Sequence, residues 1–259
     1  MENNLKIALI QTDNIWENIP ENLKSLSKKI NTIHESVDII VLPELFSTGF
    51  TMSAKPVAES MSGKAIHWML EKASNKKSLI IGSLIISENK NIYNRLIVAF
   101  PNGEIKYYDK RHLFSFAGEE KVFSAGKKKL IFEYKGFKIC PLICYDLRFP
   151  VWARNTEKID LLIYIANWPN ARISAWDTLL KARAIENLCY VIGVNRVGVD
   201  NNKLVYTGHS TVIDALGKII LEFKERQEDI KTTTLQKDQI LDTRNKFHFL
   251  DDRDVFEIK

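Results

Sequence analysis

Cysteine is scarce in this sequence, and no residues are spaced as metal ligands. The three cysteines, Cys140, Cys144 and Cys189, form an odd set without a CxxC pair, and the five histidines are scattered along 259 residues. These absences argue against a disulfide framework and against a structural zinc site. They favour a reducing, cytoplasmic location.

A long hydrophobic run is also absent. Nowhere do eighteen apolar residues stand together, and the N-terminal MENNLKIALIQTD contains only a short apolar run typical of a strand. We therefore expect neither a signal peptide nor a membrane partner. The net charge of +5 is thinly spread, and the lysines at 127–129 lack the interleaved aromatic side chains of a nucleic-acid surface.

What is present suits one large α/β domain covering residues 1–259, since 45% of the residues are hydrophobic and 27% are charged. Two runs, IIVLP and LLIYIA, are apolar throughout, so we expect these strands to be covered on both faces. Turn signals at Asn102-Gly103 and Leu216-Gly217 add antiparallel connections and predict mixed sheets. From about residue 225 the pattern becomes polar and irregular, which predicts a C-terminal tail. Strands are expected at 6–11, 38–42, 78–86, 95–100, 138–144, 160–166, 190–195 and 210–214.

Three segments each place a reactive side chain at or just after the end of an apolar strand. They are DIIVLPEL with Glu44, YYDKRHLF with Lys110 and CPLICYDLRFP with Cys144. Strand ends are where layered α/β folds hold their active sites. Taken singly, the cysteine could be a buried small hydrophobe, and the other two could be solvated surface charges. Cys144 differs because YDLRFP turns abruptly polar, which indicates a helix N-terminus that would favour a thiolate.

Taken together, and in this order, the three segments resemble the nitrilase superfamily of carbon–nitrogen hydrolases, from Lys6 to about Phe223. The resemblance implies a four-layer α-β-β-α sandwich with mixed sheets. It also implies that Glu44, Lys110 and Cys144 form the catalytic set. A second family glutamate matches Glu119 of FAGEE, although the adjacent Glu120 leaves this assignment open by one residue.

These roles require a proton to move from a thiol to a carboxylate. Unperturbed Cys and Glu side chains differ by about 4 pK units, so this transfer would cost roughly 6 kcal/mol in solution. We expect the Lys110 cation to narrow that gap and later to face the tetrahedral oxyanion together with the Tyr145 backbone N–H. The resulting scheme passes through a Cys144 thioester and gives no task to a metal or an organic cofactor.

The phrases KRHLFSFAGE, LICYDLRFPVWARN and KARAIENLCYVIGVNRVG resemble the omega-amidase branch of the superfamily, whose members hydrolyse 2-oxoglutaramate and related omega-amides to ammonia and the diacid. For this chain the resemblance implies clearance of 2-oxoglutaramate, including the product of the transaminase that ends methionine salvage. Arg148 is the candidate for the distal carboxylate, although it could instead pair with Asp146. Tyr145 is a further substrate-binding candidate, and the candidate walls of the pocket are Phe114, Phe116 and Trp168, although Trp168 could equally be core packing.

Two other functions share much of this pattern. A nitrilase or an N-carbamoyl amide hydrolase would use the same Glu-Lys-Cys set on another substrate. A non-catalytic binding module would keep the fold but is expected to lose one of the three residues, and this chain retains all of them. On the resemblance we expect a small-molecule amide as substrate, a homodimer as assembly and no nucleic-acid partner.

Overall fold

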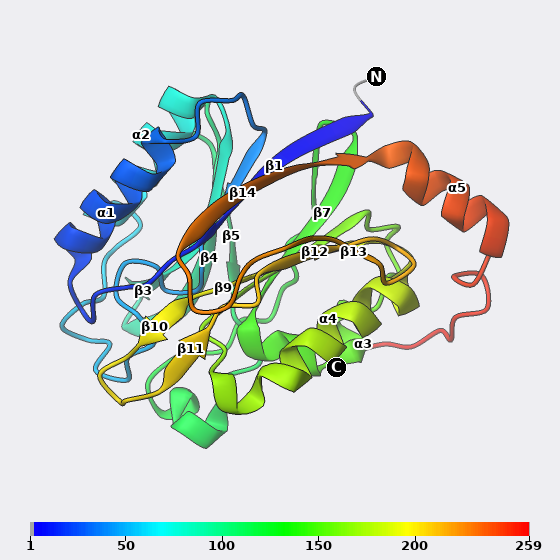
Figure 1. Ribbon diagram of the computed structural model, residues 1–259. Helices are drawn as coiled ribbons and strands as arrows, with labels where there is room; N and C mark the ends of the chain where they lie inside the picture. The colour runs from blue at the N-terminus through cyan, green and yellow to red at the C-terminus, as the bar shows by residue number, and fades with distance from the viewer. Residues whose placement is uncertain (1–2, 259) are drawn as a thin grey trace.

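The computed structural model describes residues 3–258, and two six-stranded mixed sheets form its centre (Figure 1). The first sheet has the order β14 (Asp229–Gln236), β1 (Asn4–Gln11), β2 (Ile39–Val41), β3 (Leu79–Glu88), β4 (Asn91–Ala99) and β5 (Ile105–Asp109). The second has the order β13 (Ile219–Glu222), β12 (Thr211–Ile213), β9 (Tyr190–Asn195), β8 (Leu161–Ala166), β7 (Phe137–Ile143) and β6 (Phe132–Tyr134). A separate hairpin joins β10 (Val197–Val199) to β11 (Val205–Thr207).

Strand β1 shows why these layers form. Its residues Leu5, Ile7 and Leu9 pack with side chains of the second sheet, whereas Ala8 and Ile10 on the opposite face pack against helices. Because successive side chains of a strand point to opposite faces, this uniformly apolar segment is covered on both sides. The predicted layered α/β fold with mixed sheets is therefore confirmed.

Helices cover the outer face of each sheet. On the first sheet lie α1 (Ile19–Asn31) and α2 (Lys64–Lys76), and α1 turns Leu23, Leu26 and Ile30 towards it at helical spacing. The Asn18 side chain caps α1 by accepting a hydrogen bond from the Glu21 N–H. The second sheet is covered by the short α3 (Pro150–Ala153) and by α4 (Ile173–Asn187), as Figure 1 shows. No helix within residues 3–258 is long and apolar enough to cross a membrane.

The polar segment after residue 225, for which the sequence predicts an irregular tail, supplies part of the first sheet. Strand β14 pairs antiparallel with the whole of β1, from Asn4 opposite Gln236 to Gln11 opposite Asp229. It is an edge strand whose side chains are mostly half-exposed, so it needs few apolar residues. Helix α5 (Lys237–Phe247) follows and is anchored by the buried Ile240 and by an ion pair between Arg244 and Asp160.

The topology brings the ends of several strands to one place. Strands β1, β2 and β3 run parallel, and so do β7, β8 and β9. The carboxyl ends of parallel strands meet at one edge of a sheet. The segments that follow β2, β7 and β8 carry Glu44, Cys144 and Asn167, and hydrogen bonds connect all three across the two sheets.

Candidate active site

A buried cluster of charge lies where the two sheets meet. Lys110, directly after β5, places its Nζ 3.0 Å from Glu44 Oε1 and 2.9 Å from Glu119 Oε2. The side chains of all three residues are 0% exposed. A buried charge is tolerated only when it is paired and hydrogen-bonded, and here one ammonium serves two carboxylates. The sequence places Glu44 and Lys110 in separate motifs, and the fold brings them into contact.

Two asparagines hold the Glu44 carboxylate in position. Asn94 Nδ2 donates to Glu44 Oε1 at 2.8 Å, and the Asn167 backbone N–H donates to Oε2 at 2.8 Å. Asn167 Nδ2 also donates to the Glu44 carbonyl at 2.7 Å. Neither asparagine was singled out from the sequence. An amide at the start of the buried half of β4, and another directly after the apolar β8, are the signals that could have identified them.

Glu119, and not its neighbour, contacts the lysine. Its Oε2 also accepts a hydrogen bond of 2.6 Å from the Phe114 backbone N–H, whereas Glu120 is exposed. Burial raises the pKa of the Glu119 carboxyl above its usual value, although the Lys110 ammonium acts in the opposite direction. Burial alone would lower the pKa of Lys110, but Glu119 and Glu44 together outweigh it and raise that pKa, so the ammonium stays charged.

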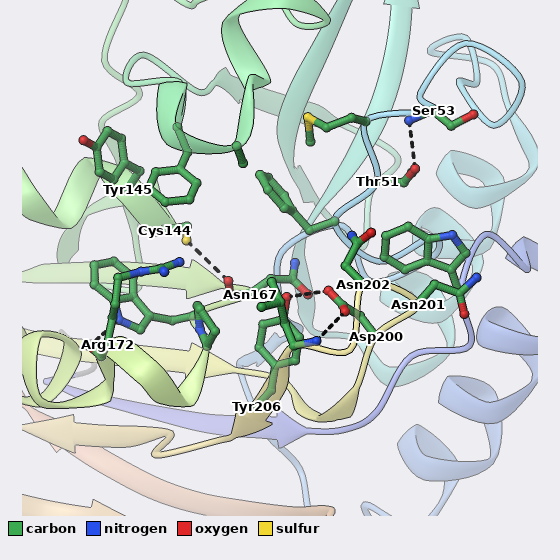
Figure 2. Close-up of a pocket in the computed structure, with 18 of the residues that line it drawn as sticks. Thr51, Ser53, Cys144, Tyr145, Asn167, Arg172, Asp200, Asn201, Asn202 and Tyr206 are labelled. Carbon is green, nitrogen blue, oxygen red and sulfur yellow. Dashed lines mark hydrogen bonds between the residues drawn. The ribbon is translucent and has the colours of Figure 1, made fainter.

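Cys144 stands at a sharp change of direction. Strand β7 ends at Ile143, and Cys144 takes a left-handed backbone conformation with φ +44°, which costs a non-glycine residue roughly 1–2 kcal/mol. Asp146 holds this bend because its buried carboxylate accepts hydrogen bonds from the Ile143 N–H at 3.0 Å and the Tyr108 hydroxyl at 2.8 Å. It also accepts from the His112 N–H at 3.1 Å. The sulfur is thereby directed towards Asn167, whose carbonyl lies 4.0 Å away (Figure 2).

The surroundings of the Cys144 thiol act against its ionisation. Burial raises the pKa of Cys144 well above its usual value, Glu44 raises it further, and Lys110 lowers it without cancelling the rise. Burial and Glu44 thus oppose the thiolate that the sequence favours at this position. The physical reason is that only a short 3₁₀ turn, Cys144–Arg148, follows the strand, and two carboxylates lie nearby.

A cavity of about 720 Å³ opens above the thiol. Four of the five predicted substrate-binding residues line it, namely Tyr145, Phe114, Arg148 and Trp168. The fifth, Phe116, does not line the cavity and is 86% exposed. It sits on a turn, Ser115–Ala117, whose residues are all exposed, and the cavity is lined instead by Phe114, just before the turn, and by Ala117 at its end.

Arg148 does not pair with Asp146, whose oxygens are taken by other donors, and its guanidinium lies 5.0 Å from the centre of the Trp168 ring. Trp168 has both roles considered for it. It lines the cavity, yet it is only 3% exposed and packs against Trp176. Asn195 fixes the Trp168 backbone with hydrogen bonds to both its N–H and its carbonyl.

Several cavity residues were not found from the sequence. Arg172, in the 3₁₀ turn before α4, lies near Cys144 and Tyr145 at one side of the view in Figure 2. The loop between β10 and β11 lies at the other side with Asp200, Asn201 and Asn202. No motif marked these residues, because the loops that carry them become neighbours only when the two sheets pack.

Comparison with known proteins agrees with this geometry. A profile of the carbon-nitrogen hydrolase family matches residues 6–245. The chain is 41% identical over 255 residues to the omega-amidase YafV of Escherichia coli (strain K12), covering 98% of each chain. It is 34% identical over 251 residues to the 2-oxoglutaramate amidase of Bacillus subtilis (strain 168), covering 95% of this chain and 96% of the relative.

Among solved structures the chain is similar to XC1258 from Xanthomonas campestris, described as a CN-hydrolase superfamily protein with an arsenic adduct in the active site. The TM-score is 0.97 at 41% identity, and 99% of each chain is covered. Sequence and structure comparisons therefore agree on the family.

Proposed function

The chain belongs to the carbon–nitrogen hydrolase family, and from that premise we propose how its buried site works as an omega-amidase. The enzyme is a hydrolase that acts on C–N amide bonds, and its proposed substrate is 2-oxoglutaramate or a related omega-amide of a dicarboxylic acid. The observation that supports this most is the Lys110 ammonium held between Glu44 and Glu119 beside the Cys144 thiol.

In the proposed first step the Cys144 sulfur attacks the amide carbonyl carbon while Glu44 accepts the thiol proton. Because the pKa of the thiol is raised, deprotonation accompanies attack instead of preceding it. Lys110 and the Tyr145 backbone N–H face the oxygen on which negative charge develops. Glu44 then returns its proton to the departing nitrogen, the C–N bond breaks, and ammonia leaves a thioester on Cys144.

In the second half Glu44 removes a proton from water, which attacks the thioester carbonyl. The C–S bond breaks, the thiol regains its proton, and the acid is released. Glu44 therefore acts as base, acid and base again. Glu119 keeps Lys110 in place through its two hydrogen bonds of 2.9 and 3.0 Å to Nζ.

Arg148 is proposed to bind the distal carboxylate of the substrate. It lines the cavity, and its guanidinium lies over the Trp168 ring without an acidic partner in the described part of the chain. An arginine held flat by an aromatic ring keeps its N–H groups available for a carboxylate.

The cellular setting is also a proposal. All three cysteines are free, as befits a reducing cytoplasm, where the enzyme would clear 2-oxoglutaramate made by glutamine transaminases, including the one that ends methionine salvage. A homodimer is proposed through the face of α3 and α4, where Val151 and Ile185 are 53% and 48% exposed. Light scattering at several protein concentrations tests that assembly, and a monomer throughout would contradict it.

The function is tested by measuring ammonia release from 2-oxoglutaramate, glutamine, a simple aliphatic nitrile and an N-carbamoyl amino acid. Strong release from 2-oxoglutaramate alone is the expected result. Activity confined to the nitrile or to the carbamoyl compound would keep the catalytic residues but assign the chain to another hydrolase class. Ammonia release from glutamine as fast as from 2-oxoglutaramate would contradict the preference for omega-amides of keto or dicarboxylic acids.

A further inference from the structure

A second arginine in the cavity lacks an acidic partner. The guanidinium of Arg172 lies 5.1 Å from the centre of the Phe114 ring and 6.0 Å from that of Phe116. Within residues 3–258 these rings are the contacts of its guanidinium, because the hydrogen bonds of Arg172 are made by its backbone: its N–H donates to the Pro169 carbonyl at 3.0 Å, and its carbonyl accepts from the Trp168 indole N–H at 2.8 Å. The side chain is half-buried and lines the cavity.

Such a side chain is ready for an anion. A guanidinium has five N–H donors, and those of Arg172 face the cavity with no acceptor from the described part of the chain. Three other arginines that reach the interior have carboxylate partners: Arg95 pairs with Asp109, Arg183 with Glu186 and Arg196 with Asp13. Arg172 and Arg148 both line the cavity that contains Cys144, and neither has an ion pair in the described chain.

The carboxylates of the cavity are already engaged elsewhere. Asp200 accepts hydrogen bonds from the Tyr206 hydroxyl and the Leu204 N–H, both at 2.9 Å, and Glu17 accepts from the Thr51 hydroxyl at 2.5 Å. In Figure 2, Asp200 lies at the opposite side of the view from Arg172. These acids hold their own loops and leave the two arginines without a protein anion.

The buried cluster of Glu44, Lys110 and Glu119 cannot bind the carboxylate of an acidic substrate, so the substrate needs a separate anion-binding site in the cavity. Glu44 and Glu119 flank one ammonium, so the cluster has no surplus positive charge with which to attract an anion. A carboxylate that enters the cavity must therefore be compensated by other groups on its walls.

We propose that Arg172 is a specificity-determining residue that, together with Arg148, binds the carboxylate at the end of the substrate remote from the scissile amide. The inference rests on the proposed omega-amide hydrolysis for its choice of substrate. Two guanidiniums supported by Phe114 and Trp168 form a clamp for one carboxylate, and the acyl chain between clamp and thiol sets which omega-amides fit.

The test compares succinamate with succinamide, which replaces the carboxylate by a neutral amide of nearly the same size. Arg172→Gln is expected to lower kcat/KM for succinamate by about 10- to 100-fold, mainly through KM, because a charge-assisted hydrogen bond is lost. Its kcat/KM for succinamide should change less than about threefold. Arg172→Lys should recover part of the loss, because it restores charge without the planar fork.

Arg226→Gln is the matched control, since Arg226 is exposed and does not line the cavity. Equal losses on both substrates, or no loss on succinamate, would overturn the role of Arg172 while leaving amide hydrolysis intact. Succinate binding measured by calorimetry needs no turnover, so it tests the anion site at Arg172 separately from the proposed hydrolysis of omega-amides. If Arg172→Gln raises the Kd for succinate at least about tenfold over that of the unsubstituted protein, the anion site is supported even when neither compound is hydrolysed. An unchanged Kd rejects the site.

Discussion

Lys110 is the single residue on which the charge balance of the site depends. Lys110→Met would leave Glu44 and Glu119 buried without a cation, and it would remove the proposed donor to the oxyanion. We expect kcat to fall by about 100- to 1000-fold. The variant should also lose stability as the pH rises from about 5 to 7, because two buried carboxylates cannot both stay ionised cheaply.

Steady-state kinetics and thermal unfolding across this pH range measure both effects. A change confined to KM would reassign Lys110 to substrate binding, and an unchanged pH profile of stability would show that the two carboxylates do not repel one another.

Glu119 and Glu120 provide a matched pair, because they are neighbours of the same type in different environments. Glu119→Gln keeps the size of the side chain but gives Lys110 one fewer charged partner, so kcat should fall by about 10- to 100-fold. Glu120→Gln should change kcat less than twofold, since Glu120 is exposed. Equal effects of the two changes, measured as ammonia release at saturating substrate, would contradict the geometry.

Residues of this kind show where sequence reasoning stops. Glu44, Lys110 and Cys144 could be selected because each stands in a specific motif, and Glu44 and Cys144 also follow apolar strands. Asn94, Asn167 and Arg172 could not, because an isolated amide or guanidinium has no chemical meaning until the fold supplies its neighbour. The raised pKa of Cys144 was missed for the same reason, since it depends on burial and on carboxylates distant in sequence.

At the scale of elements, strands buried on both faces were the most predictable. Segments such as LLIYIA are uniformly apolar and correspond to central strands like β8. The edge strands β6, β13 and β14 were missed because at least one face of each meets solvent and their patterns are polar or short. Strand β5 was missed as well, although its terminal Asp109 directly precedes Lys110.

Strand β9 and helix α4 are packed through a glycine. A Cβ atom at Gly193 would lie 2.5 Å from Leu180 Cδ1 and 2.8 Å from a ring carbon of Trp176, both on α4. We expect Gly193→Ala to lower the free energy of unfolding by about 1–3 kcal/mol, because the helix must move away from the sheet. Activity should also fall, since Trp176 packs against Trp168 of the cavity wall.

Denaturant unfolding and kcat/KM measured on the same preparation test this coupling. A stable Gly193→Ala variant with full activity would show that α4 can shift without disturbing the site.

At the scale of the whole molecule, three buried thiols make the stability of the fold depend on pH in the same direction. Burial raises the pKa of Cys140 to about 12 and also raises those of Cys144 and Cys189. Above about pH 8.5 the unfolded chain releases thiol protons that the native protein retains, so each thiol removes about 1.4 kcal/mol of stability per pH unit. Between about pH 8.5 and 10, the free energy of unfolding of Cys144→Ala should fall less steeply with pH, because one thiol proton fewer is released on unfolding. Identical slopes in denaturant titrations would contradict the raised pKa of Cys144.

The most direct test of the central claim is ammonia release from 2-oxoglutaramate by the unmodified protein and by Cys144→Ala, together with the mass of each protein, and of its peptides after digestion, following rapid quenching. The mechanism predicts turnover and an acyl group on the peptide containing Cys144 in the intact protein. It predicts neither in Cys144→Ala, which should keep its folded structure. Sustained ammonia release by folded Cys144→Ala would contradict the mechanism and remove Cys144 as the nucleophile.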